Sequence, residues 1–121
     1  MHFGTIATGR IGLAVLRRLK PFRLHLHYTD PHRLSREIEK ELWLTFHPDA
    51  ESLVRAVDIV SLQMPLYPST EHFFNDHMFS VMKRGSYLID TARGKLVERD
   101  AVVRALESGR LAGYAGDVWF P

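Results

Sequence analysis

The sequence contains no cysteine among its 121 residues. This absence excludes disulfide bonds, thiolate catalysis and cysteine-ligated metals, and it is compatible with the cytoplasm, which is the localisation that we expect. Seven histidines are left to carry a metal site. His25 and His27 alternate along a predicted strand, while His72 and His77 stand five positions apart in a helical region, off the i, i+4 spacing of paired ligands. We therefore expect no bound metal.

Long apolar runs and charge of a single sign are absent as well. No segment approaches the roughly 18–20 apolar residues that span a bilayer, and no basic segment leads into an apolar one at the N-terminus, so we expect neither a membrane partner nor secretion. Lysine and arginine number 16 against 14 acidic residues, a net charge of +2, with no run of five like charges. Charge therefore predicts no nucleic-acid partner.

What is present is the composition of an ordinary globular domain. Hydrophobic residues make up 45% of the chain and charged residues 25%, which is enough apolar material for a buried core. The length is that of one domain, so we expect residues 1–121 to form a single unit, and a two-domain enzyme is excluded for this chain.

Short apolar runs alternate with helical patterns along the chain. Strands are predicted at residues 3–8, 24–29, 44–47, 59–64, 87–91 and 113–119, and helices at residues 11–19, 33–42, 50–56, 75–82 and 99–107. This alternation predicts an α/β fold of the doubly wound, Rossmann-like kind, with about six parallel strands and helices on both faces of the sheet. Ligands of such sheets bind beyond the carboxyl ends of the strands.

A glycine turn follows the first predicted strand. Gly9, Arg10, Ile11 and Gly12 open a helix and resemble the dinucleotide motif G-x-G-x-x-G, with Ala7 at the first glycine position. Gly9 would let the backbone approach a pyrophosphate, and Gly12 would let the helix pack on the strand. Ala7 is tolerable at negative φ but would cost about 1–2 kcal/mol in the left-handed region. A tight strand-to-helix turn without a ligand is the alternative interpretation.

An acidic residue, Asp30, closes the second predicted strand, eighteen positions after Gly12. A carboxylate at this place accepts hydrogen bonds from the adenosine ribose diol and repels a 2′-phosphate, so NAD is favoured over NADP. Two alternatives stay open. Asp30 could serve only as a turn former before Pro31, and His32 or Arg33 could pair with a phosphate.

Four segments carry a family resemblance: Gly9-Arg10-Ile11-Gly12, His27-Tyr28-Thr29-Asp30, Thr91-Ala92-Arg93-Gly94 and Gly113-Tyr114-Ala115-Gly116-Asp117-Val118-Trp119. Together they resemble the NAD-binding domain of D-2-hydroxyacid dehydrogenases, and more narrowly that of NAD-dependent formate dehydrogenases, oxidoreductases that transfer a hydride from formate to NAD. The resemblance runs from Gly4 to Pro121. Bacterial formate dehydrogenases also have alanine at the first glycine position, so Ala7 supports the narrower assignment.

The resemblance implies roles for further residues. Arg93 would bind and polarise the substrate carboxylate beside the nicotinamide, for which a planar guanidinium is well suited. Asp117 would bind the nicotinamide carboxamide, and Pro65 and Thr91 would contact the cofactor. The alternatives are a surface salt bridge for Arg93, a strand-end cap for Asp117, and plain turn and strand positions for Pro65 and Thr91.

Several positions depart from the family's pattern, among them Gln63, Tyr67, Ser69 and Asp90. Most of the departures surround the adenine and nicotinamide ends of the expected site, so they concern cofactor affinity more than the fold. Asp90 lies three residues before Arg93 and could compete with a substrate carboxylate if the two side chains point to the same side.

In the family, the catalytic histidine and the substrate domain belong to segments that none of the residues here match. The resemblance therefore implies an NAD-binding domain that is inactive alone. Two alternatives remain: half of an active enzyme completed by another chain, and a structural module that has lost the cofactor. The resemblance also implies a homodimer. Apolar candidates for its contact, for each of which core burial is the favoured interpretation, are Trp43, Phe73, Phe74 and Trp119.

Overall fold

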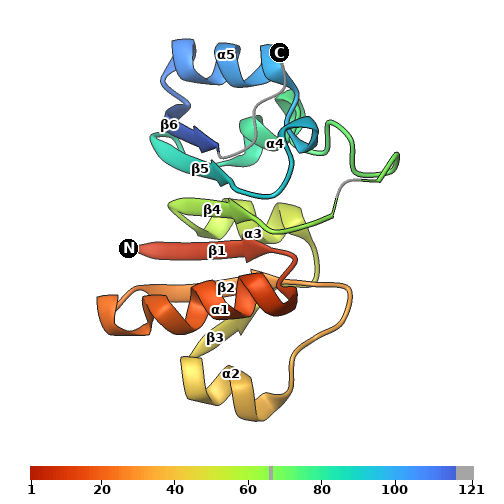
Figure 1. Cartoon of the computed structure of the whole chain (residues 1–121). Helices are drawn as coiled ribbons and strands as arrows, with labels where there is room; N and C mark the ends of the chain where they lie inside the picture. The colour runs from red at the N-terminus through yellow and green to blue at the C-terminus, as the bar shows by residue number, and fades with distance from the viewer. Residues whose placement is uncertain (66, 117–121) are drawn as a thin grey trace.

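Six parallel strands form one sheet in the computed structural model, which describes residues 1–65 and 67–116 (Figure 1). The strands are β1 (His2–Ile6), β2 (His25–Thr29), β3 (Leu44–Phe46), β4 (Ile59–Leu62), β5 (Ser86–Asp90) and β6 (Leu111–Gly116). Their order in the sheet is β3-β2-β1-β4-β5-β6, so the direction of winding reverses between β1 and β4. This is the order of a doubly wound dinucleotide-binding sheet, and it confirms the predicted fold class.

Helices connect consecutive strands. They are α1 (Gly9–Leu19), α2 (Arg36–Leu42), α3 (Ala50–Ala56), α4 (Asp76–Val81) and α5 (Arg99–Ser108), with short 3₁₀ turns at Lys20–Phe22 and Gly94–Leu96. Side chains of Ser35, Asp49 and Asn75 accept the backbone N–H three residues on and so cap α2, α3 and α4. Gly109, at φ 78°, ends α5 in the left-handed conformation. No helix of the described residues is long and apolar enough to span a membrane.

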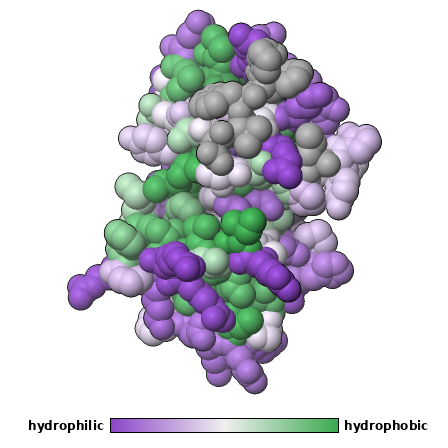
Figure 2. Space-filling view, viewed as in Figure 1, coloured by the Kyte–Doolittle hydropathy of each residue, from purple (hydrophilic) through white to green (hydrophobic). Residues whose placement is uncertain are grey.

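The apolar residues of the strands divide between the two faces of the sheet. Phe3 packs with Leu16 of α1 and Leu42 of α2 in one cluster. Ile6, on the other face of β1, belongs to a larger cluster that α3, α4 and α5 cover. Figure 1 shows α1 in front of the sheet and α3 behind it, and Figure 2 shows a hydrophobic area across the middle of the same view. Because helices cover both faces of the sheet, side chains on both sides of each strand are buried, which explains the continuous apolar runs in the sequence.

Two expectations about individual residues are wrong. Trp43 is 85% exposed instead of buried, because it ends α2 in the left-handed conformation beside β3, the edge strand, beyond which no described element covers it. His72 has φ 55° and lies before α4, not in a helix with His77. Phe74, in contrast, is fully buried as predicted. Trp119 lies outside the described residues.

Candidate functional site

Parallel register brings the loops that follow the strands to one edge of the sheet. Ile6 of β1 is paired with Thr29 of β2 and with Leu62 of β4, and Leu62 is paired with Asp90 of β5. The residues that follow these strand ends therefore lie at the same edge, on the right in Figure 1. They include Ala7 to Gly12, Asp30, Pro65, Thr91 and Arg93. Asp117 follows β6 in sequence but lies outside the described residues.

The glycine turn has two residues in the left-handed region, Ala7 at φ 64° and Gly9 at φ 51°. Because Ala7 adopts the left-handed region, it carries the strain of about 1–2 kcal/mol that we expected for that conformation alone. A Cβ at Gly9 would meet no atom within 4 Å, whereas a Cβ at Gly12 would lie 3.4 Å from the carbonyl oxygen of Ala7. Arg10 and Ile11, in the first turn of α1, are exposed. The turn thus has an open side above Gly9 and a closely packed side at Gly12.

Asp30 ties the glycine turn to the end of β2. Its Oδ2 accepts the backbone N–H of Thr8 at 2.7 Å, and its Oδ1 accepts the N–H of His32 at 2.8 Å. The N–H of Ala7 also bonds to the carbonyl of Thr29, at 2.8 Å. The bond to His32 is the turn-forming role that we kept as an alternative, and the bond to Thr8 joins residues 22 positions apart. Sequence reasoning missed this second bond, although Thr8, as the residue before α1, has a backbone N–H that needs a partner.

Arg93 is exposed, and its backbone and side chain bond locally. Its N–H donates to Oδ1 of Asp90 at 3.2 Å, and its Nη1 donates to the carbonyl of Ala92 at 2.8 Å. Among residues 1–65 and 67–116, no carboxylate forms an ion pair with the Arg93 guanidinium, so the surface salt bridge is not observed. The other donors of the guanidinium are open to a carboxylate from outside.

The condition under which Asp90 would compete with a substrate carboxylate for Arg93 is not met, because the Asp90 side chain bonds to backbone N–H groups and forms no ion pair with the guanidinium. Asp90 is 1% exposed, and its Oδ1 accepts the N–H groups of Ala92 and Arg93, so it orders the turn that presents the arginine. Burial raises the pKa of Asp90, and the two backbone hydrogen bonds oppose that shift. Its Oδ2 is buried and has no hydrogen-bond partner in the described part of the chain. Burial, with a contribution from Asp90, also raises the pKa of Tyr114 to about 12.

The segment after β4 lies next to the glycine turn. A Cβ at Gly12 would be 3.5 Å from Cγ of Gln63, whose amide donates to the hydroxyl of Ser61 at 2.9 Å. Gln63 is therefore a residue of this site that sequence reasoning treated only as a departure from the pattern. Pro65 is exposed, and its carbonyl accepts the hydroxyl of Thr70 at 2.9 Å. Thr91 is exposed directly after β5.

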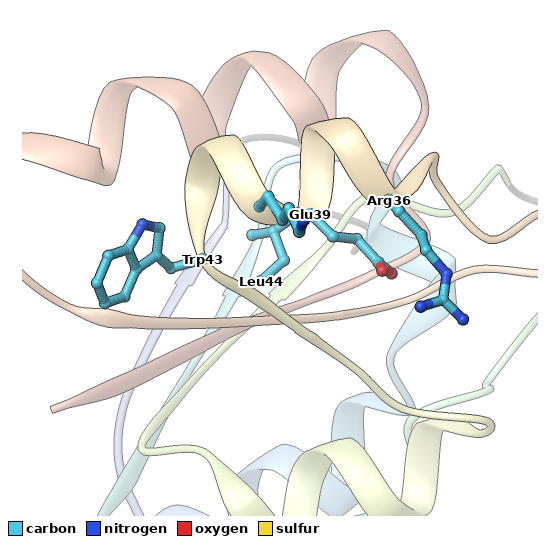
Figure 3. A pocket seen from close by; sticks show the side chains of 5 residues that line it. Arg36, Glu39, Trp43 and Leu44 are labelled. Atoms are coloured by element: carbon cyan, nitrogen blue, oxygen red, sulfur yellow. The ribbon is translucent and has the colours of Figure 1, made fainter.

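Other features lie outside the predicted site. A shallow hollow between α2 and β3 is lined by Arg36, Glu39, Lys40, Trp43 and Leu44, none of which is a predicted site residue (Figure 3). Within the described ranges, no group of three histidine or acidic side chains is arranged to hold a metal ion.

Comparison with known proteins identifies the family. The sequence profile described as "D-isomer specific 2-hydroxyacid dehydrogenase, NAD binding domain" matches residues 1–121. The chain belongs to this family. The predicted family and cofactor class, NAD, are confirmed, and the sheet order and glycine turn are those that the family's cofactor requires.

Relatives of this NAD-binding domain include formate dehydrogenases. The chain is 64% identical to formate dehydrogenase of Pseudomonas sp. (strain 101) over 121 residues, which are 100% of this chain and 30% of that protein. It is 47% identical to formate dehydrogenase of Neurospora crassa over 98% of the chain and 32% of the relative. The chain therefore spans about a third of the length of these relatives.

Solved structures agree with this assignment. A Granulicella formate dehydrogenase superposes with a TM-score of 0.96 at 61% identity, covering 100% of this chain and 32% of that one. An NAD-complexed D-isomer specific 2-hydroxyacid dehydrogenase from Lactobacillus delbrueckii ssp. bulgaricus superposes with a TM-score of 0.89 at 34% identity, covering 98% and 35%. The NAD-binding domain is thus similar in sequence and in fold to the matching part of formate dehydrogenases.

Proposed function

We propose that this chain, residues 1–121, is the NAD-binding domain of an enzyme that transfers a hydride from formate to NAD. The observation that carries the proposal is the glycine turn, which Asp30 holds at the point where the winding of the sheet reverses. The identity with formate dehydrogenases along the whole chain supports the choice of formate. We expect a cytoplasmic protein and a homodimer, as the resemblance implies.

The residues at this edge fit a dinucleotide. The first N–H groups of α1 have no intrahelical partner, its first turn holds no acidic residue, and open space lies above Gly9, so a pyrophosphate could approach the backbone there. Each oxygen of Asp30 accepts one backbone N–H, whereas a carboxylate offers about four acceptor sites. Asp30 therefore keeps acceptor capacity for the two hydroxyls of a ribose.

Each remaining residue has a proposed part in holding the reactants. Bound NAD supplies the hydride acceptor. The Arg93 guanidinium, open to the outside, orients a small carboxylate by two parallel hydrogen bonds, and Asp90 orders the turn on which Arg93 stands. Thr91 and Pro65, both exposed at this edge, contact the cofactor, and Asp117 binds the carboxamide.

Calorimetric titration with NAD tests the proposal directly. We expect saturable binding, and its absence at millimolar NAD would contradict the proposed function. A second assay follows NADH formation from NAD and formate. We expect no turnover by this chain alone, because the exposed Arg93 leaves a bound carboxylate in contact with water. Measurable turnover would show that the chain is active by itself.

A further inference from the structure

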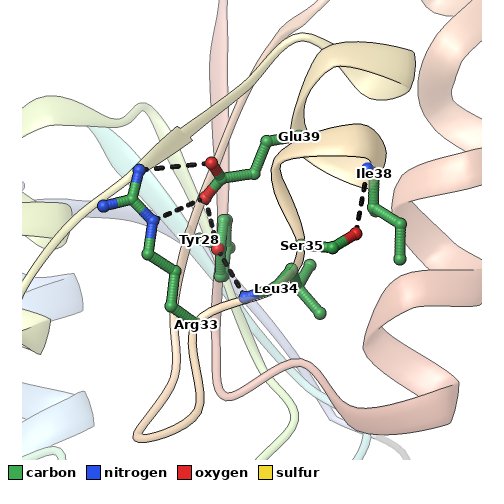
Figure 4. A network of polar contacts seen from close by, with 6 residues as sticks. All are labelled: Tyr28, Arg33, Leu34, Ser35, Ile38 and Glu39. Carbon is green, nitrogen blue, oxygen red and sulfur yellow. Dashed lines mark hydrogen bonds and ion pairs between the residues drawn. The ribbon is translucent and has the colours of Figure 1, made fainter.

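Arg33 follows Asp30 by three residues, but its side chain pairs with a residue of α2. Its Nε lies 3.0 Å from Oε2 of Glu39, and its Nη2 lies 3.2 Å from Oε1, which makes a two-pronged ion pair (Figure 4). The guanidinium carbon lies 4.6 Å from the centre of the Phe46 ring. Two groups, a carboxylate on α2 and an aromatic ring on β3, therefore hold in place the cation that the loop after β2 carries.

Glu39 is itself held by a buried partner. The hydroxyl of Tyr28, a fully buried residue, donates to Oε2 of Glu39 at 2.6 Å and accepts the N–H of Leu34 at 2.9 Å. The Glu39 side chain is only 11% exposed. The bonds from Arg33 and Tyr28 lower the pKa of Glu39, and burial raises the pKa of Tyr28 to about 12. At neutral pH the carboxylate is therefore charged and its tyrosine donor is protonated.

The loop between β2 and α2 thus points its two charged side chains to different places. The carboxylate of Asp30 meets the N–H of Thr8 in the glycine turn, whereas the guanidinium of Arg33 meets α2 and β3. An enzyme of this fold that accepts a 2′-phosphate places an arginine near the ribose. Arg33 has the right chemistry and the right sequence position, but its Nε and Nη2 already donate to Glu39.

We propose that Glu39 is a specificity-determining residue for the cofactor: it withholds Arg33 from the ribose edge, so that Asp30 meets the ribose without a cation beside it. The inference rests on the proposed NAD site. It assigns the discrimination against a 2′-phosphate to two carboxylates. Asp30 repels the phosphate, and Glu39 binds the arginine that could otherwise neutralise the phosphate charge.

Calorimetric titrations with NAD and with NADP test the proposal on four variants. Glu39→Gln releases Arg33, and we expect the NADP affinity to rise roughly three- to fivefold relative to NAD, the size of one exposed charge pair. Arg33→Gln should leave the ratio of the two affinities at the wild-type value, because the arginine is already withheld. The double substitution should return to that value. Glu37→Gln, on the same helix and exposed, removes an equal charge without touching the pair.

The outcomes distinguish a failure of the role of Glu39 from a failure of the proposed NAD-binding function. Wild-type protein that binds NAD, together with an unchanged ratio in Glu39→Gln, would overturn the role of Glu39 and leave the proposed function standing. A fall of NADP affinity in Arg33→Gln would also overturn it, since Arg33 would then already contact the phosphate. Absence of NAD binding by the wild type would overturn both. If Glu39→Gln does not fold, Phe46→Leu, which removes the ring beneath the guanidinium, should shift the ratio in the same direction.

Discussion

Gly9 and Gly85 both adopt positive φ, at 51° and 79°, and a Cβ at either would meet no atom within 4 Å. At the scale of the residue they carry the same backbone cost for a side chain, but only Gly9 lies in the turn between β1 and α1. Substitutions at the two glycines therefore distinguish backbone strain from lost ligand contact, because Gly85 precedes β5 at the amino ends of the strands, away from the glycine turn.

Substituting Gly9→Val is expected to abolish NAD binding, since a branched side chain would fill the space that the pyrophosphate needs. Both Gly9→Val and Gly85→Val should lose stability, by about 1–2 kcal/mol from the left-handed conformation. Urea unfolding measures the stability and calorimetry the affinity. Equal NAD affinities in the two variants would show that the glycine turn does not contact the cofactor.

Asp30→Ala removes the acceptor of the Thr8 N–H and the proposed ribose ligand together. We expect NAD affinity to fall at least about tenfold, the range for a lost charged hydrogen bond, while the discrimination against NADP relaxes. Asp49→Ala is the matched control, because Asp49 also accepts a backbone N–H, that of Ser52 at 2.7 Å, but at the cap of α3. Unchanged affinities for both cofactors in Asp30→Ala would refute the ribose role.

At the scale of the element, a chain of histidines on the α3 side joins β1, β2 and the residue that follows β3. Nδ1 of His2 lies 2.9 Å from Nε2 of His27, Nδ1 of His27 lies 2.9 Å from Nε2 of His47, and Nδ1 of His47 lies 2.8 Å from the hydroxyl of Ser52. Each ring-to-ring bond holds one proton, so both bonds stay intact with at most one excess proton on the three rings. A second proton must break a bond.

Acid should therefore destabilise this part of the sheet. Burial, and then the neighbouring His47 and His2, lower the pKa of His27 from 6.5 to about 4. The unfolded chain binds more protons than the folded chain between these values, so stability is full above pH about 6.5 and falls as the pH drops toward about 4, by roughly 3 kcal/mol at most. Other groups that act on the chain are His25, Asp49, Asp58, Lys83 and the Met1 amino group.

Urea unfolding at several pH values checks this expectation. His27→Gln keeps a side chain that can donate and accept but removes the titration, so its stability should depend less on pH between about 6.5 and 4. His32→Gln, which is exposed and lies outside the chain of histidines, is the control and should keep the wild-type slope. An unchanged slope in His27→Gln would place the acid sensitivity elsewhere.

Element boundaries show how far local patterns reach. All six strands and five helices are found where the sequence predicts them, because apolar periodicity and capping residues are local signals. Several predicted strands continue too far at the carboxyl end, as in β1, which ends at Ile6 and not at residue 8. Pairing ends there because Ala7 turns into the left-handed region, a change that apolar character does not reveal.

At the scale of the whole molecule, NAD binding should be visible as stability. A ligand present at 100 times its Kd adds about 2.7 kcal/mol to the free energy of unfolding, which for a domain of this size raises Tm by roughly 10 °C. Thermal unfolding with and without NAD measures the shift, and formate alone is the control. Gly9→Val should show no shift with NAD, and a shift equal to that of the wild type would contradict the assigned site.

Taken by itself, the sequence determined the alternation of strands and helices, the glycine turn, the acidic residue after β2 and the family, because each is written in neighbouring residues or in a local motif. Only the tertiary structure decided how these residues are used. The bond between Asp30 and Thr8, the capture of Arg33 by Glu39 and the burial of Asp90 depend on which groups meet when elements pack. A charged side chain can bind a ligand or stabilise the fold, and the groups that lie next to it in the folded protein decide between these two roles.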